Sequence, residues 1–179
     1  MKTKAIKMAT FMGLVLTLVF ACSTKDDTNN IASMEASEVV AKQQAVVFIA
    51  GYDKGSQTYY KDAKKHFQAQ NYTIVDDAFS LQEIIAWLNK NHNEQDYNEI
   101  HIVNKGNAKQ GLSLETTIHG ARLSHESLLN CLKESKLPKL QNVLAEDSKV
   151  VFHTSELGKN KALLQRLKQT FTANYQPKV

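Results

Sequence analysis

Two short turns carry side chains whose types could support hydrolysis by a nucleophile. Lys105 follows an apolar run that ends at Val103, and Ser155 follows one that ends at Phe152. Serine attacks a carbonyl when a nearby base takes its proton, and lysine serves as that base when burial lowers its pKa. Ser155 and Lys105 could therefore form a hydrolase pair. The polar loop around Lys105 favours the alternative, a solvated lysine and a helix-capping serine.

The six histidines do not have the spacing of metal ligands. No His-x-x-x-His pair occurs, and the closest pair, His119 and His125, flanks a predicted turn. We therefore predict no metal site. His101 and His153 fall on neighbouring predicted strands, where they form either a polar pair near the two turns or two separate core histidines with their own partners. We favour the second arrangement.

Aromatic residues and a glycine loop lie near the same expected edge. Tyr52, Tyr59 and Tyr60 follow the first predicted strand, and they could line a binding groove, although the helical spacing of Tyr60 also suits a core position. The loop that begins at Gly51 lacks both the glycine-lysine-serine/threonine ending of a P-loop and the three-glycine dinucleotide pattern. We interpret it as a tight connection, and we predict no cofactor.

The elements that must position these residues alternate along the chain. Short apolar runs predict strands, and apolar residues at helical spacing predict helices, two of them capped by Ser80 and Ser124. The predicted strands cover 45–50, 72–75, 99–103 and 149–152, with an exposed hairpin over 111–120; the predicted helices cover 57–70, a segment from Ser80, a segment from Ser124 and 161–173.

This alternation predicts an α/β fold with three layers, in which helices cover both faces of a mostly parallel sheet. Parallel strands end at one edge of their sheet, so the turns with Lys105 and Ser155 should lie at the same edge. Residues 175–179 look like the approach to a fifth strand, which suggests a domain truncated at its C-terminus.

The first residues predict targeting sequence. Basic residues precede an uncharged apolar stretch from Met8 to Ala21, which is too short to span a bilayer permanently. The segment Val19–Cys22 resembles a bacterial lipobox, whose cysteine receives lipid before the leader is removed. We therefore predict a signal peptide over 1–21 and lipidation, including palmitate, of Cys22. The alternative is an ordinary secretory leader with an incidental cysteine.

The residues that follow indicate a destination. Lys25, Asp26 and Asp27 resemble the lysine-plus-two-acids signal that sends lipoproteins to the cell surface in the Bacteroidetes group. We predict that residues 22–44 comprise the lipidated cysteine, this export signal and a polar tether, and that the domain covers 45–179. The expected location is the outer membrane, with exposure at the cell surface and a lipid anchor on Cys22 as the membrane contact.

Charge and cysteine content exclude several classes of protein. Removal of residues 1–21 takes away three of the 22 basic residues and none of the 18 acidic ones, so the net charge falls from +4 to +1. With only two arginines in the chain, no nucleic-acid partner is predicted. Once Cys22 carries lipid, Cys131 has no cysteine to pair with, and its place on a predicted helix indicates a packing role.

From Val46 onward the order of elements resembles the caspase-like fold, found in the clan that holds caspases, gingipains and related bacterial proteins. In that clan a histidine-glycine pair follows the third strand and a cysteine follows the fourth. The segment 99–114, the capped helix from Ser124 and the final strand-turn-helix carry the resemblance. The resemblance implies that Lys105 stands at the histidine position and Ser155 at the cysteine position.

Both catalytic residues of that clan are therefore replaced. A thiolate is nucleophilic and an imidazole exchanges protons near neutral pH, whereas serine and lysine need stronger local activation. We expect an inactive caspase-like domain that binds a protein or peptide or has a structural role. The alternatives are a hydrolase that uses Ser155 and Lys105, and a flavodoxin-like surface lipoprotein without a catalytic site.

Overall fold

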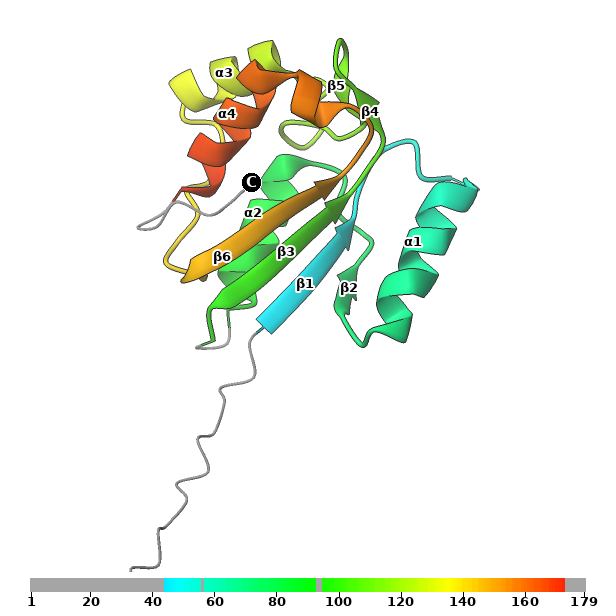
Figure 1. The fold of residues 1–179 in the computed structure, drawn as a ribbon. Helices are drawn as coiled ribbons and strands as arrows, with labels where there is room; N and C mark the ends of the chain where they lie inside the picture. Colours follow the sequence, from blue (N-terminus) through cyan, green and yellow to red (C-terminus); the bar gives the residue numbers. More distant parts are fainter. Residues whose placement is uncertain (1–43, 56, 93–94, 173–179) are drawn as a thin grey trace, which may run out of the picture. The chain divides into compact units, whose positions relative to one another are not determined.

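The computed structural model describes residues 44–55, 57–92 and 95–172 (Figure 1). The predicted signal peptide, the lipidation site at Cys22, the export signal Lys25–Asp27 and the suggested fifth strand at 175–179 all lie outside the described residues.

Four parallel strands form the central sheet. In chain order they are β1 (Gln44–Ile49), β2 (Thr73–Val75), β3 (Tyr97–Val103) and β6 (Leu144–His153), and in the sheet they lie in the order β2-β1-β3-β6. All four predicted strands are confirmed. The last begins five residues earlier than predicted, because the polar segment before Lys149 joins β6 across a register shift opposite Tyr97 and Glu99.

The helices alternate with the strands as predicted. They are α1 (Thr58–Ala69), α2 (Leu81–Lys90), α3 (His125–Lys133) and α4 (Lys161–Phe171), and a 3-10 turn η1 (Leu157–Lys159) precedes α4. Ser80 and Ser124 cap the starts of α2 and α3, as the sequence predicts, and each forms a capping box, Ser80 with Glu83 and Ser124 with Ser127. Asn160 caps α4 by accepting the backbone N–H of Leu163 at 3.0 Å.

The two faces of the sheet are covered unequally. Alternate residues of β1, among them Val46 and Phe48, pack in a large core with α2, α3 and α4. Val47 and Ile49 point to the other face, where they pack with Phe67 in a smaller cluster. Figure 1 shows α1, the helix that carries Phe67, beside β2 and apart from α2, α3 and α4. The three-layer α/β prediction is therefore confirmed, and among the described residues α1 is the only helix on its face.

The predicted exposed hairpin over 111–120 is confirmed in part. Residues 112–116 turn back on 121–123 through the antiparallel bridge of Glu115 with Arg122, and β5 (Gly111–Leu112) also pairs with β4 (Gly106–Asn107). The predicted exposure of the first arm is wrong. Leu112 and Leu114 are buried, because the segment lies against the backbone of Leu123 and joins the large core. Gly111 has a φ of +80°, and a Cβ there would lie 2.1 Å from the Leu123 carbonyl oxygen, so the position requires glycine.

The strand order does not separate the two expected fold families. The second, first, third and fourth strands in chain order lie side by side, which is also how a flavodoxin-like sheet begins.

Candidate functional site

Lys105 and Ser155 lie at the same edge of the sheet, as the sequence predicts. Val103 ends β3 and pairs with His153, which ends the neighbouring strand β6. Lys105 and Ser155 each follow two residues later. The Asn104 N–H donates to the His153 carbonyl at 3.2 Å, and this bond holds the two turns together.

The Lys105 side chain is turned toward α1. Its backbone N–H donates to the Tyr60 hydroxyl at 3.0 Å. Its ammonium donates to the Gln57 side-chain oxygen and lies 5.9 Å from the centre of the Tyr59 ring. The residue is exposed, whereas a lysine becomes a general base when burial disfavours its charge. The contacts of Lys105 are those of a solvated lysine.

Ser155 has no activating partner within the described part of the chain. The side chain is exposed, and no hydrogen bond joins its hydroxyl to Lys105 or to another described residue. The helix-capping role that the sequence favoured is wrong, because the cap of η1 is Glu156, in the left-handed conformation, and the cap of α4 is Asn160. The structure thus places Ser155 and Lys105 at one edge without joining them as a dyad.

The tyrosines of this edge divide into one buried and two exposed residues. Tyr60 is 4% exposed, and its hydroxyl donates to Asp53 at 2.6 Å. Burial, together with that hydrogen bond, raises the pKa of Tyr60 well above its usual range. Tyr52 and Tyr59 are 48% and 38% exposed. Tyr60 is therefore core, as one of the two sequence interpretations holds, while the other two tyrosines remain available to a ligand.

A pair of histidines lies beside α1, which is the arrangement that the sequence analysis did not favour. His101 Nδ1 is 2.8 Å from His153 Nε2, and the rings stack with centroids 5.1 Å apart. The register pairs His101 with Val151, so His153, two residues further along β6, is its diagonal neighbour on the same face. Phe67 of α1 packs against both rings, at 5.0 and 5.4 Å.

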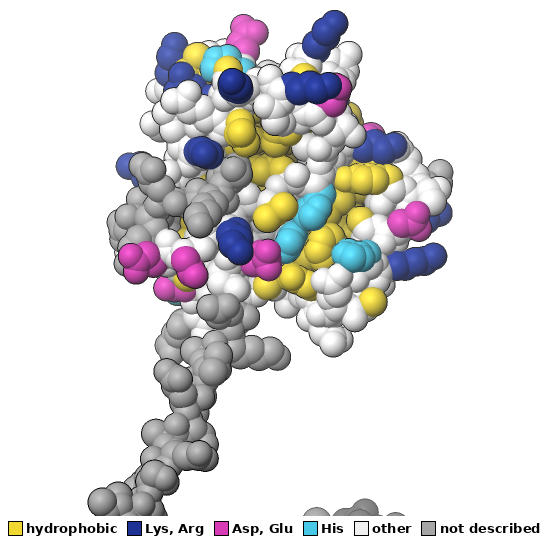
Figure 2. Space-filling view, viewed as in Figure 1, with side chains coloured by type: hydrophobic (Ala, Val, Ile, Leu, Met, Phe, Trp, Pro, Cys, Tyr) yellow, Lys and Arg dark blue, Asp and Glu magenta, His cyan; other side chains and the backbone are white. Residues whose placement is uncertain are grey.

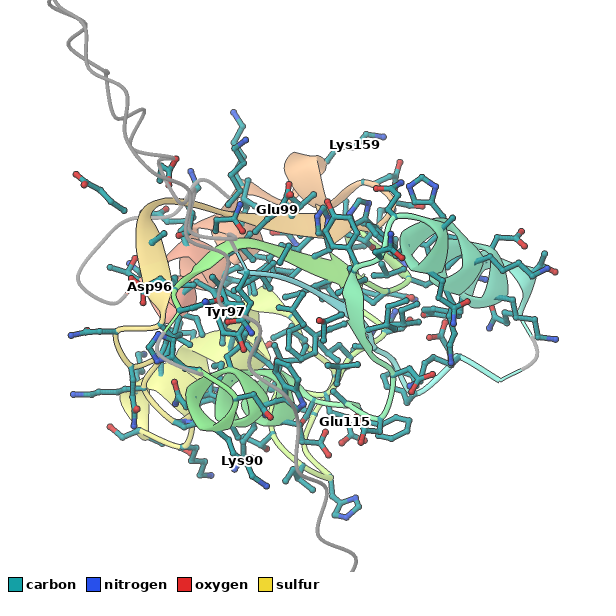
Figure 3. The ribbon with its side chains drawn as sticks, turned by 90° about the horizontal axis from the view of Figure 1, so that it is seen from below. Lys90, Asp96, Tyr97, Glu99, Glu115 and Lys159 are labelled. Atoms are coloured by element: carbon teal, nitrogen blue, oxygen red, sulfur yellow. The ribbon has the colours of Figure 1, made fainter. Side chains whose placement is uncertain are left out.

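A carboxylate lies behind the pair. Glu99 Oε1 is 3.5 Å from His101 Nε2, and Nε2 is buried without a hydrogen bond among the described residues. Tyr72 donates to the other oxygen of Glu99 at 3.3 Å. Figure 3 shows α2, with Lys90, on one side of the strands and Glu99 toward the opposite side. Glu99, His101 and His153 are named the histidine chain from here on.

Electrostatics keeps both histidines neutral at pH 7. Burial lowers the pKa of His101, and the nearby Glu99 only partly opposes this effect. Burial also lowers the pKa of His153, with further contributions from His101 and His66. A neutral imidazole has one donor nitrogen and one acceptor nitrogen, so the pair can hold a defined proton arrangement.

An open cavity of about 550 Å³ lies between α1 and the ends of β3 and β6, and it is named the α1 cavity. Tyr59, Phe67, Val103, His153 and Ser155 are among its lining residues. Figure 2 shows histidines in the middle of this face of the molecule, surrounded by hydrophobic side chains. The cavity exists because α1 covers β1 and β2 while no described helix covers β3 and β6 on this side.

The described residues form neither a metal-binding cluster nor a membrane-spanning helix. No group of three or more histidine, cysteine, aspartate or glutamate side chains there is placed to hold a metal ion. Within the same residues, no helix has the length and apolar character needed to cross a membrane. Cys131 packs against the large core, as predicted, and burial raises the pKa of its thiol.

Sequence reasoning missed the role of Glu99 and the α1 cavity. The signal available in the sequence was the alternation Glu99-x-His101, which places both side chains on one face of β3. It could not show that the facing layer lacks a second helix.

Comparisons of the chain with protein-family models, with curated proteins and with solved structures gave no match.

Proposed function

We propose that this chain is a lipid-anchored cell-envelope protein whose caspase-like domain binds a protein or peptide ligand and does not hydrolyse it. The α1 cavity is the binding site in this proposal. The observation that carries it is the position of the two replaced catalytic residues: Lys105 contacts Gln57 and Tyr59, and Ser155 lies on the cavity wall without a base.

The surroundings of Ser155 and Lys105, as far as the described residues form them, support the non-catalytic part of the proposal. A serine hydrolase needs a base within hydrogen-bond reach of the hydroxyl and a base whose proton affinity suits the task. The Lys105 ammonium is committed to Gln57, and Lys105 is exposed. These features disfavour the alternative hydrolase based on Ser155 and Lys105.

The shape and lining of the edge support the binding part. A cavity of about 550 Å³ is within the range of ligand sites, which are mainly apolar with a few polar groups. Tyr59 is 38% exposed at its rim, and its hydroxyl donates to the His153 carbonyl at 2.6 Å. That bond holds the aromatic ring against the cavity in a fixed position.

A hydrolysis assay tests the distinction between binding and catalysis. The purified chain, Ser155→Ala and Lys105→Ala are compared on a fluorogenic peptide library and on p-nitrophenyl esters. We expect the three proteins to give the same background rate. Turnover by the original chain that is lost in both variants would overturn the proposal and establish the Ser155 and Lys105 hydrolase.

Cell fractionation tests the location. With Cys22→Ser, the protein should leave the membrane fraction, because the lipid attachment site is gone. Replacement of Lys25, Asp26 and Asp27 by alanine should leave it anchored but protected from protease added to intact cells. A Cys22→Ser protein that stays in the membrane fraction would contradict the lipid anchor.

A further inference from the structure

The histidine chain gives the α1 cavity a defined hydrogen-bonding character. Resting on the proposed function, we infer that this cavity binds a phenol-like group, and that Glu99 and His101 make His153 a hydrogen-bond acceptor for the phenolic O–H. Three features indicate the ligand class: the proton positions in the histidine chain, the residues that line the cavity and the charges around it.

The proton positions follow from the carboxylate. A negative Glu99 oxygen 3.5 Å from His101 Nε2 favours an N–H at that nitrogen. His101 Nδ1 is then an acceptor, so the 2.8 Å bond to His153 requires an N–H on His153 Nε2. His153 Nδ1 is left with its lone pair, and no described residue bonds to it. The free nitrogen of His153 is therefore an acceptor.

The residues that line the cavity favour a ligand with an aromatic ring. Ala63, Phe67 and Val103 supply apolar surface, and Tyr59 supplies an aromatic ring at the rim. Phe67 already makes ring contacts with both histidines, so a further ring in the cavity can continue the same cluster. An aromatic ring with one donor group matches these walls and the single acceptor.

The charges at the cavity disfavour anionic ligands at neutral pH. Asp62 of α1 lines the cavity, and among the described residues no lysine or arginine lines it. Both members of the histidine pair are uncharged at pH 7 because burial lowers their pKa values. Several titratable or charged groups of the described residues lie around the pair. They are Tyr59, Asp62 and His66 on α1, Tyr72 beside β2, Glu99 on β3, and Lys149 on β6, which lies opposite Glu99 in the strand register.

Acid should remove the preference for a phenolic O–H. When one proton enters the chain, His153 carries N–H groups on both nitrogens, because the bond to His101 keeps Nε2 engaged. His153 Nδ1 then becomes a donor, and the advantage of a phenol over its methyl ether disappears. The change occurs below the ordinary histidine pKa of 6.5, since both pKa values are lowered.

Two probes of nearly equal shape test the inference. p-Cresol has the phenolic O–H, and 4-methylanisole has the same ring with that O–H methylated. Binding of each to the purified chain is followed by NMR through the imidazole signals. At pH 7.5 we expect p-cresol to bind about 3- to 10-fold more tightly, the range of one net hydrogen bond. At pH 5 the two probes should bind with closer affinity.

Glu99→Gln is the critical variant, since a glutamine amide can donate to His101 Nε2 and reverse the proton order. The preference for p-cresol should vanish in Glu99→Gln and persist in the matched control Glu146→Gln, an exposed residue of β6 that does not line the cavity. Nitrogen-15 correlation spectra read the tautomers without a ligand: His153 should carry its proton on Nε2 in the original chain.

The outcomes separate this inference from the proposed function. Equal affinity for the two probes at pH 7.5, or a proton on His153 Nδ1 in the original chain, overturns the inference while the absence of hydrolysis still stands. Ser155-dependent hydrolysis overturns the proposed function whatever the probes do. A capped Gly-Gly-Tyr-Gly-Gly peptide that binds more tightly than p-cresol identifies a tyrosine side chain of a partner protein as the source of the phenol; weaker binding identifies a free phenol.

Discussion

The capping box of α2 allows a stability prediction that can be worked out from individual hydrogen bonds. The Ser80 hydroxyl accepts the Glu83 N–H at 3.1 Å and donates to a Glu83 carboxylate oxygen at 2.8 Å. The same oxygen accepts the backbone N–H groups of Ser80 and Phe79, at 2.8 and 2.9 Å. Ser80 is 0% exposed. Ser80→Ala removes two of these bonds where water cannot readily replace them.

The magnitude follows from the type of partner. Loss of a serine N-cap costs about 0.5–2 kcal/mol. A hydrogen bond to a charged group contributes about 1.5–3 kcal/mol, against about 1 kcal/mol for a neutral one. We therefore expect Ser80→Ala to lower the free energy of unfolding by about 2 kcal/mol, at the upper end of the cap range. In the second capping box the partner is the neutral Ser127, so Ser124→Ala should cost about 1 kcal/mol.

Urea unfolding followed by circular dichroism and by tryptophan fluorescence measures both values. Trp87, the only tryptophan, lies on α2 and packs edge-to-face against Phe48 with ring centroids 5.4 Å apart, so its fluorescence reports the docking of that helix. The urea dependence of the unfolding free energy should not change. A loss for Ser80→Ala that is smaller than the loss for Ser124→Ala would refute the reasoning from the charged, buried partner.

Three further predictions concern the loop, the histidine chain and the exposed edge. Gly111→Ala should lower the free energy of unfolding by about 3 kcal/mol or more, because the added Cβ would meet the Leu123 carbonyl oxygen at 2.1 Å. Thermal unfolding measures the loss. Gly158→Ala is the control and should have a small effect, because a Cβ there meets no atom within 4 Å. The unfolding free energy should fall as the pH drops below 6.5, because His101 and His153 have lowered pKa values in the folded chain and bind protons more readily in the unfolded chain. Urea titrations measure this fall, and it should be weaker in a double variant with His101→Phe and His153→Phe. Lys105→Ala and Ser155→Ala should each change the unfolding free energy by less than about 0.5 kcal/mol, since both side chains are exposed; a larger loss in the same titration would show that the edge depends on them for stability.

Local patterns predicted most of the elements because each depends on neighbours along the chain. The apolar run of β1 is buried on both faces, which is why it contains no polar alternation. The capping boxes at Ser80 and Ser124 join residues three positions apart, so their hydrogen bonds depend only on residues that are close in the sequence. In the segment 111–120 the alternation indicated the antiparallel turn but not its burial, because packing against the large core buries Gly111, Leu112, Ser113 and Leu114 together.

The candidate site was also predicted only in part from the sequence. That Lys105 and Ser155 follow adjacent parallel strands was predictable from the alternation of strands and helices. That they do not form a dyad was decided by side-chain partners elsewhere in the chain: Lys105 contacts Gln57, 48 residues away.

By itself the sequence determined the α/β class, the alternation of strands and helices, the helix starts and the edge at which Lys105 and Ser155 lie, since periodicity and caps act over a few residues. Only the tertiary structure decided that His101 and His153 meet across 52 residues, that Glu99 stands behind them, and that α1 leaves a cavity beside them. The physical reason is that strand register and the coverage of each sheet face are set by the packing of the whole domain.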